Sequence, residues 1–131
     1  MSVELTMLAY CVALLLVLIV IQVVAGIRTQ GLMPLANSRD DLPPPGVFQA
    51  RAGRVVQNHR EGLTMMAPLL LMVAVMDASS PLTVLGAQLF FYSRVAHAVV
   101  YLAGLPLIRP LIWGVGLAGI VMVLAHLLGF A

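Results

Sequence analysis

The sequence predicts an all-α membrane protein, a four-transmembrane-helix bundle, and three observations support this fold class. Of the 131 residues, 62% are hydrophobic and only 9% are charged, whereas a soluble domain is roughly 25% charged. A bilayer core about 30 Å thick needs about 20 apolar residues for each crossing helix. Four apolar segments of that length with short connections fill the chain, so we expect a single membrane domain over residues 1–131.

Turn-forming residues separate the predicted spans. Gln22 alone interrupts the first span, and a polar loop that ends in Pro43-Pro44-Pro45 follows it. The second span begins after these prolines and contains Pro68, a candidate kink. Short segments rich in Gly, Ser and Pro separate the second span from the third and the third from the fourth. We expect the spans at about residues 5–27, 47–76, 82–103 and 107–128.

The arginines predict how the bundle is oriented. Those that flank the first and third loops are Arg28, Arg39, Arg51, Arg54 and Arg109. The second loop and both terminal segments carry no arginine or lysine. Loops on the cytoplasmic side of a membrane are the ones enriched in these residues. We therefore expect both termini outside the cytoplasm, and the compact loops without an organelle signal favour a bacterial inner membrane.

Composition argues against several other kinds of protein. The net charge is +2 and all seven basic residues are arginine, so no flexible lysine tail suggests a nucleic-acid partner. Cys11 is the single cysteine and lies in an apolar run, where a small buried side chain is expected. His126 has no second ligand nearby, and no glycine-rich loop could bind phosphate. We expect neither a metal site nor binding to DNA or RNA.

Polar side chains form a stripe on the second predicted helix. Arg54, Asn58 and Glu61 are spaced i, i+4 and i+7, which keeps them within about 60° of arc. Arg51 extends the stripe by one turn. About 20 residues counted back from Asp77 place the cytoplasmic membrane boundary near residue 57. Asn58 and Glu61 are therefore expected just inside the membrane.

A second stripe lies on the third predicted helix, where Arg94, His97 and Tyr101 are spaced i, i+3 and i+7. Counted from the outer end of the helix, Arg94 lies about 18 Å deep, past the bilayer midplane. The two stripes should therefore lie at the same depth and touch. His59 and Arg60 point away from the first stripe, and we expect them to contact lipid headgroups or a neighbouring subunit.

The charges of these stripes suggest an anionic ligand. An ionised side chain in a bilayer costs at least about 2.5–3.5 kcal/mol, so Glu61 and Arg94 are expected to pair inside the bundle. Such a pair alone would only hold helices together. Arginines outnumber glutamate in this layer, however, and the remaining positive potential would attract an anion.

Arg109 adds to this positive potential. Pro110 favours the first turn of a helix, so Arg109 is expected beside the partially positive N-terminus of the fourth helix. An anion or a thiolate would be stabilised there by both groups. The alternative is an interfacial arginine that only sets the orientation of the chain.

The residues resemble the MAPEG superfamily, membrane-associated proteins in eicosanoid and glutathione metabolism that include the microsomal glutathione transferases. Phe48-x-x-Arg51-x-x-Arg54-x-x-x-Asn58-x-x-Glu61 is similar to the second-helix signature of the family. The ten residues from Ser93 to Leu102 are similar to its third-helix signature. The four-span plan, the long first loop and the arginine that opens the fourth helix also agree.

This resemblance implies a homotrimer that binds glutathione between subunits, in the cytoplasm-facing half of the membrane. The family's binding positions match five residues of the two stripes, and Arg28 resembles its first-helix arginine. With His97 from the third-helix stripe, the candidate binding residues are Arg28, Arg54, Asn58, Glu61, Arg94, His97 and Tyr101. Arg109 stands where family members have the arginine proposed to stabilise the glutathione thiolate, and it is the candidate catalytic residue.

Three functions remain open. The first is a glutathione-dependent transferase or peroxidase that acts on lipophilic electrophiles from the membrane. The second is a non-enzymatic trimer of the same fold that binds an anionic lipid or a regulatory ligand. The third, a small multidrug exporter, predicts a carboxylate deep in the first helix, whereas Glu4 lies at its extreme end. Formation of a glutathione thiolate would distinguish the first function from the second.

Overall fold

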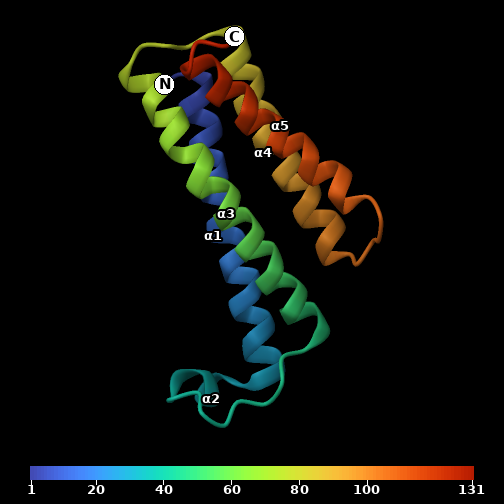
Figure 1. The fold of residues 1–131 in the computed structure, drawn as a ribbon. Coiled ribbons are helices and arrows are strands. Elements are labelled where there is room, and N and C mark those ends of the chain that lie inside the picture. Colours follow the sequence, from blue (N-terminus) through green and yellow to red (C-terminus); the bar gives the residue numbers. More distant parts are fainter.

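The computed structural model describes all 131 residues and contains four long helices and a short one (Figure 1). The helices are α1 (Val3–Gln30), α2 (Leu32–Ala36), α3 (Val47–Val75), α4 (Pro81–Leu102) and α5 (Arg109–Leu127). The long helices lie over the four segments expected from the sequence, with ends that differ by a few residues. The short helix α2 within the first loop was not predicted.

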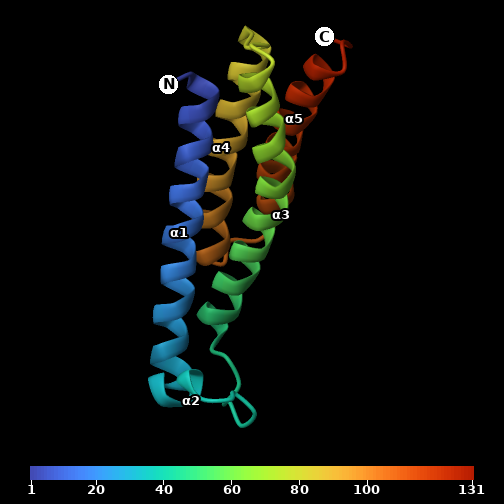
Figure 2. The same ribbon diagram turned by 90° about the vertical axis from the view of Figure 1, so that its left-hand side faces the viewer.

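The helices pack as a long pair and a shorter hairpin. α1 and α3 run side by side, and the α4–α5 hairpin lies along one part of their length (Figures 1 and 2). Both chain termini and the α3–α4 turn lie at one end of the molecule, and α2 with the first loop lies at the other. We call these the terminal end and the loop end. The α4–α5 turn points toward the loop end, and Gly104 of this turn lies against Arg51 in the first part of α3.

Local sequence explains where the helices begin and end. Ser80 caps α4, because its hydroxyl accepts a 3.2 Å hydrogen bond from the Thr83 amide. Pro81 follows as the first residue of that helix. α1 ends at Gly31, whose φ of +87° is open to glycine without strain. α5 opens with Arg109 and has Pro110 in its first turn, as the sequence predicted.

Two helices, α1 and α5, are long and apolar enough to cross a membrane by length and composition. Large apolar side chains on both are exposed, among them Leu16 on α1 and Leu111 on α5. α3 and α4 carry the two polar stripes, which lower their mean hydropathy. That all four long helices cross a membrane stays a prediction.

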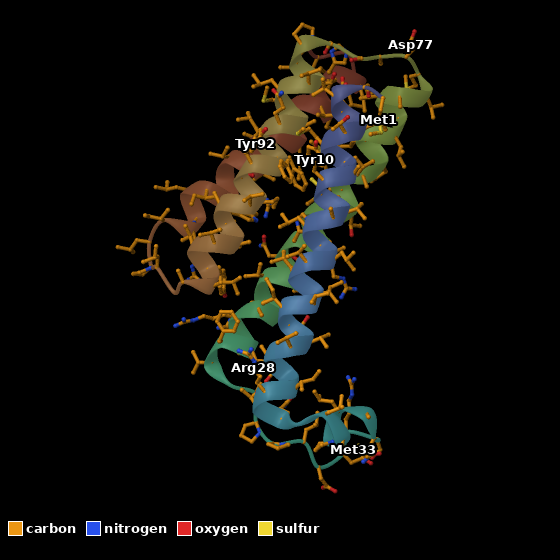
Figure 3. The ribbon with its side chains drawn as sticks, turned by 180° about the vertical axis from the view of Figure 1, so that it is seen from behind. Met1, Tyr10, Arg28, Met33, Asp77 and Tyr92 are labelled. Atoms are coloured by element: carbon orange, nitrogen blue, oxygen red, sulfur yellow. The ribbon has the colours of Figure 1, made fainter.

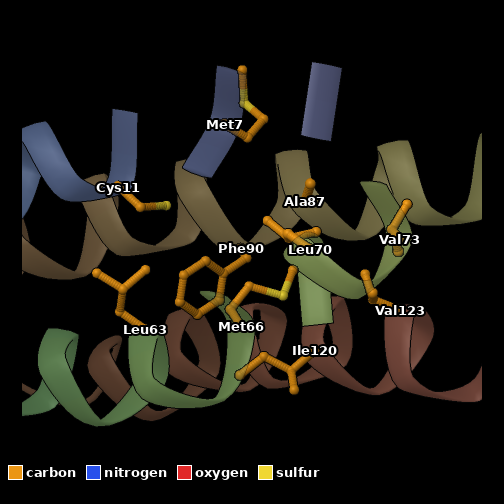
Figure 4. Close-up of a cluster of buried hydrophobic side chains, with 10 residues drawn as sticks. All are labelled: Met7, Cys11, Leu63, Met66, Leu70, Val73, Ala87, Phe90, Ile120 and Val123. Carbon is orange, nitrogen blue, oxygen red and sulfur yellow. The ribbon is translucent and has the colours of Figure 1, made fainter. Parts of the chain in front are cut away.

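The larger of two buried hydrophobic clusters lies toward the terminal end and contains residues of all four long helices (Figure 4). Its members are Met7, Cys11, Leu63, Met66, Leu70, Val73, Ala87, Phe90, Ile120 and Val123. Phe90 and Met66 are fully buried, and Met suits such a site because its flexible chain fills irregular gaps. Cys11 is buried here, as predicted.

Glycines bring the backbones of α4 and α5 into close contact. A Cβ atom added to Gly119 would lie 2.5 Å from the carbonyl oxygen of Gly86. A Cβ atom on Gly86 would lie 2.8 Å from the carbonyl oxygen of Gly119. Small residues allow such close helix packing in membranes. The contact fixes the side of α5 that faces the polar stripe of α4.

Candidate functional site

Three helices bring Arg54, Tyr101 and Arg109 together. Arg54 Nε on α3 donates a 2.7 Å hydrogen bond to Tyr101 Oη on α4. The guanidinium carbon of Arg109, at the start of α5, lies 4.4 Å from the centroid of the Tyr101 ring. That of Arg54 lies 5.7 Å from the same ring. Tyr101 therefore holds two like charges near one another through a hydrogen bond and cation–π contacts.

Two open cavities adjoin this cluster and share Tyr101 and Arg109. One has a volume of about 290 Å³ and is lined by Asn58, His97, Tyr101, Arg109, Pro110 and Trp113. The other has a volume of about 180 Å³ and is lined by Arg51, Arg54, Tyr101, Gly104, Leu105, Pro106 and Arg109. No acidic side chain lines either cavity, so their positive charge is uncompensated.

Arg51 joins the cluster by lying against the α4–α5 turn. A Cβ atom on Gly104 would lie 2.6 Å from Arg51 Nη1, so a larger residue would displace this guanidinium group. Gly104 also has a φ of +74°, which disfavours other residues. Sequence reasoning read Gly104 only as a turn residue and missed that it makes room for Arg51.

Arg94 is buried next to the site and fixes the position of Asn58. Its side chain is 3% exposed, and its guanidinium carbon lies 5.1 Å from the centroid of the Phe90 ring. Arg94 Nη1 donates a 2.5 Å hydrogen bond to Asn58 Oδ1, which fixes the amide that lines the larger cavity. Arg94 Nε has no hydrogen-bond partner.

Glycines on the two neighbouring helices make room for Arg94 and for the Phe90 ring beside it. A Cβ atom on Gly116 of α5 would lie 2.6 Å from both Arg94 Nη2 and Ser93 Oγ. On α3, a Cβ atom on Gly62 would lie 3.1 Å from Cε2 of Phe90, the ring against which Arg94 packs. Sequence reasoning missed both glycines, although a glycine inside a helix costs about 1 kcal/mol relative to alanine and so signals a spatial requirement.

The predicted ion pair between Glu61 and Arg94 is wrong. Glu61 is exposed, and its carboxylate accepts a 3.1 Å hydrogen bond from Gln57 Nε2 on the same helix. Asn58 takes the place of the acid as the partner of Arg94. The reason is the position of Glu61 at the edge of the stripe, about 60° around the helix from Asn58.

Arg28 also lies apart from the cluster. It is exposed near the loop end of α1 (Figure 3), where it lines a separate, mostly apolar groove with Phe48. His97, in contrast, is buried against Tyr101 with ring centroids 5.6 Å apart and lines the larger cavity. Of the predicted site residues, the chain brings together Arg54, Asn58, Arg94, His97, Tyr101 and Arg109, and leaves Arg28 and Glu61 outside.

The expectation that His59 contacts headgroups or a neighbouring subunit is wrong. His59 is 2% exposed and its Nε2 donates a 2.8 Å hydrogen bond to the carbonyl oxygen of Cys11. Its ring also stacks on Phe90, with centroids 6.4 Å apart. His59 therefore faces α1 rather than lipid, and it connects α3 to α1 and α4.

Comparison with known protein families finds one match. A family model described as the MAPEG family matches residues 7–129 of the chain. No curated protein and no solved structure matches it. Because the family match covers nearly the whole sequence, the chain belongs to the MAPEG family. Membership indicates a membrane protein related to glutathione or eicosanoid metabolism.

Proposed function

We propose that this member of the MAPEG family is a glutathione-dependent transferase or peroxidase that acts on lipophilic electrophiles at the membrane. One observation carries the proposal. Arg51, Arg54 and Arg109 line two adjoining cavities that have no acidic lining residue. Glutathione carries two carboxylates, so its charge is complementary to these arginines, which can bind a carboxylate through two parallel hydrogen bonds.

Each residue of the cluster has a role in holding the peptide. Arg51 and Arg54 would bind carboxylates, and Tyr101 would position Arg54 and Arg109. Asn58 Oδ1 already accepts from Arg94, so its Nδ2 group remains as a donor for a peptide carbonyl. His97 would contact the same ligand from the wall of the larger cavity.

Arg109 would activate the thiol. A free thiol has a pKa of about 8.5, and an adjacent arginine at a helix N-terminus lowers it. The thiol proton would pass to water. In the transferase reaction, the thiolate forms a bond to an electrophilic carbon as the leaving group departs. In the peroxidase reaction, it attacks a hydroperoxide oxygen and gives an alcohol and glutathione sulfenic acid, which a second glutathione reduces to a disulfide and water.

The proposal includes a homotrimer in a bacterial inner membrane, with all four long helices spanning and both termini outside the cytoplasm. Arg28 and Glu61 do not reach the cluster within one chain, and a site between subunits would let a neighbouring chain supply them. The exposed apolar faces of α1 and α5 provide surface for lipid and for a second subunit. A site open to the bilayer would admit an apolar electrophile.

The experiment measures the thiolate ultraviolet band and the conjugation of a chlorodinitrobenzene with detergent-solubilised protein and glutathione. We expect saturable binding, a thiolate band and product formation, all reduced in Arg109→Ala. Arg39→Gln removes an arginine outside the cluster and should change none of them. Binding without a thiolate band, unaffected by Arg109→Ala, would instead favour the non-enzymatic trimer that binds an anionic lipid or regulatory ligand.

A further inference from the structure

The largest cavity lies away from the arginine cluster, at the loop end. It has a volume of about 520 Å³ and lies between the end of α1, the first loop and the start of α3. This size is within the range of about 300–1,000 Å³ that is usual for small-ligand sites. None of the candidate glutathione-binding residues lines it.

Hydrogen bonds between glutamine side chains build one wall of the cavity. Gln30 Nε2 donates to the carbonyl oxygen of Pro43 at 2.6 Å, and Gln49 Nε2 donates to Gln30 Oε1 at 2.8 Å. Gln49 Oε1 in turn accepts from the Thr29 hydroxyl and from the Gly46 amide. These bonds tie α1, the first loop and α3 together, so the cavity has a fixed polar wall.

Gln22 and Arg39 supply free donors to the same cavity. Gln22 interrupts the apolar sequence of α1, lines the cavity and makes no side-chain hydrogen bond within the chain. A carboxamide at membrane depth needs a partner, because leaving it unpaired costs several kcal/mol. Arg39 Nε donates to the carbonyl oxygen of Leu35 at 2.8 Å, which leaves its terminal amino groups available.

The rest of the lining is mostly apolar. Ile27, Leu35 and Leu42 face the same space as Gln22 and Arg39. The cavity therefore combines one cation and hydrogen-bond donors with an apolar wall, next to the loop end of a helix apolar enough to cross a membrane. Asp40 and Asp41 share a different pocket with Arg39 and do not line this one.

We propose that this cavity binds an anionic phospholipid from the adjoining leaflet. Its phosphate would contact Arg39, because basic pockets beside membrane helices bind anionic head groups. The ester carbonyls below the phosphate would accept hydrogen bonds from Gln22, and the first part of an acyl chain would pack against Ile27 and Leu35. This lipid site is separate from the proposed glutathione site, and neither depends on the other.

Photocrosslinking tests the proposal. The protein in detergent micelles is exposed to phosphatidylglycerol with a diazirine near the glycerol end of one acyl chain, or to the matching phosphatidylcholine, and labelled peptides are mapped by mass spectrometry. We expect phosphatidylglycerol to label the end of α1 and the first loop. Wild-type protein with phosphatidylcholine should give about fivefold less labelling. The Arg39→Gln variant with phosphatidylglycerol should show the same loss, because one arginine near a membrane surface contributes about this much to binding.

Two further variants test whether the lipid enters the cavity. Gly26→Val should block labelling, because a Cβ atom at Gly26 would already lie 3.2 Å from Gln49 Nε2 and 3.4 Å from Leu35 Cδ1. Ala13→Val places the same side chain at an exposed position of α1 and is the control. Gln22→Leu removes the free amide without adding bulk. If Gly26→Val fails to fold, this variant tests whether the lipid enters the cavity. It should also reduce labelling.

Several results would overturn the proposal. Equal labelling by both lipids, or labelling that survives both Gly26→Val and Gln22→Leu, would place the lipid outside the cavity. Protection by inorganic phosphate alone would indicate a free-phosphate site, and labelling that misses the end of α1 and the first loop would show that the lipid does not enter this cavity. Glutathione binding, measured on the same samples, should be unchanged in Gln22→Leu and Arg39→Gln, so failure of one proposal is distinguishable from failure of the other.

Discussion

Polar groups at the terminal end have hydrogen-bond partners within the chain, whereas the arginines around Tyr101 have no acidic partner. At the terminal end, Glu4 is 1% exposed and its carboxylate accepts hydrogen bonds from the Ser79 hydroxyl at 2.6 Å and the Thr83 hydroxyl at 2.7 Å. His126 Nε2 lies 3.1 Å from the carbonyl oxygen of Ala78 nearby. In the arginine cluster, by contrast, the cavities around Tyr101 are lined by arginines and by no acidic side chain.

This difference separates structural polar groups from candidate ligand groups. Buried polar groups that are fully hydrogen-bonded stabilise the fold, and Glu4 connects α1 to the α3–α4 turn and to α4 in this way. The arginines around Tyr101 have no carboxylate partner within the chain, so they create a positive potential that an anionic ligand can neutralise. Substitutions at the terminal end should therefore change stability, and substitutions in the arginine cluster around Tyr101 should change glutathione chemistry.

Arg109→Ala should have the largest effect. Removing a charge that stabilises a developing or formed anion typically costs about 10²–10³ in rate. We expect kcat/KM for conjugation to fall by this factor, with the free energy of unfolding nearly unchanged. Steady-state kinetics and thermal unfolding of the same preparation measure both. A variant that conjugates at the wild-type rate would remove Arg109 from the mechanism.

Glu4→Ala should have the opposite profile. The Ser79 and Thr83 hydroxyls lose a buried, charged acceptor, so we expect the free energy of unfolding to fall by about 3 kcal/mol. Chemical unfolding in detergent micelles provides the measurement, and glutathione affinity should stay at the wild-type value. Glu4→Gln keeps one acceptor oxygen and should lose less stability. Loss of affinity without loss of stability would contradict the division between the terminal end and the arginine cluster.

Gly116→Ala should weaken glutathione binding by about tenfold, because the new methyl group displaces Arg94 and with it the Asn58 amide. Gly114→Ala is a matched control on the same helix, since a Cβ atom there has no neighbour within 4 Å. Titration calorimetry with glutathione compares the two. Equal affinities for both variants would show that the space around Arg94 does not matter for binding.

Tyr101→Phe should have the smallest effect. It removes the hydrogen bond from Arg54 but keeps the ring beneath Arg109. We expect KM for glutathione to rise by about fivefold, which is the worth of one ordinary hydrogen bond, while kcat changes little. A large fall in kcat at constant KM would mean that the hydroxyl acts on the thiol directly.

Much of the fold could be predicted from the sequence, because apolar segments and turn residues place helices directly. The sequence also indicated that Arg54, Asn58, Arg94 and Tyr101 lie on facing stripes, since helical spacing decides which residues share a face. Spacing does not say which side chain in a stripe takes a given partner, and Asn58 rather than Glu61 contacts Arg94.

Long-range packing was harder to predict. Glu4 looked like a residue at the extreme end of the first helix, and its partners lie 75 and 79 residues away in the sequence. His59 looked exposed because helical spacing placed it off the stripe, yet α1 covers that face. Which face of a helix its neighbours cover depends on how the helices pack, and in an apolar sequence the pattern of residues gives little information about it.

The most direct test of the central claim compares two double variants that lose the same charge. Calorimetric titration with glutathione is carried out on wild type, on Arg54→Gln with Arg109→Gln, and on Arg39→Gln with Arg60→Gln. The account predicts that the first pair loses measurable binding and that the second binds as wild type does. If both double variants bind glutathione with the same affinity, whether that affinity equals the wild-type value or is lower, the result would contradict a glutathione site at Arg54, Tyr101 and Arg109.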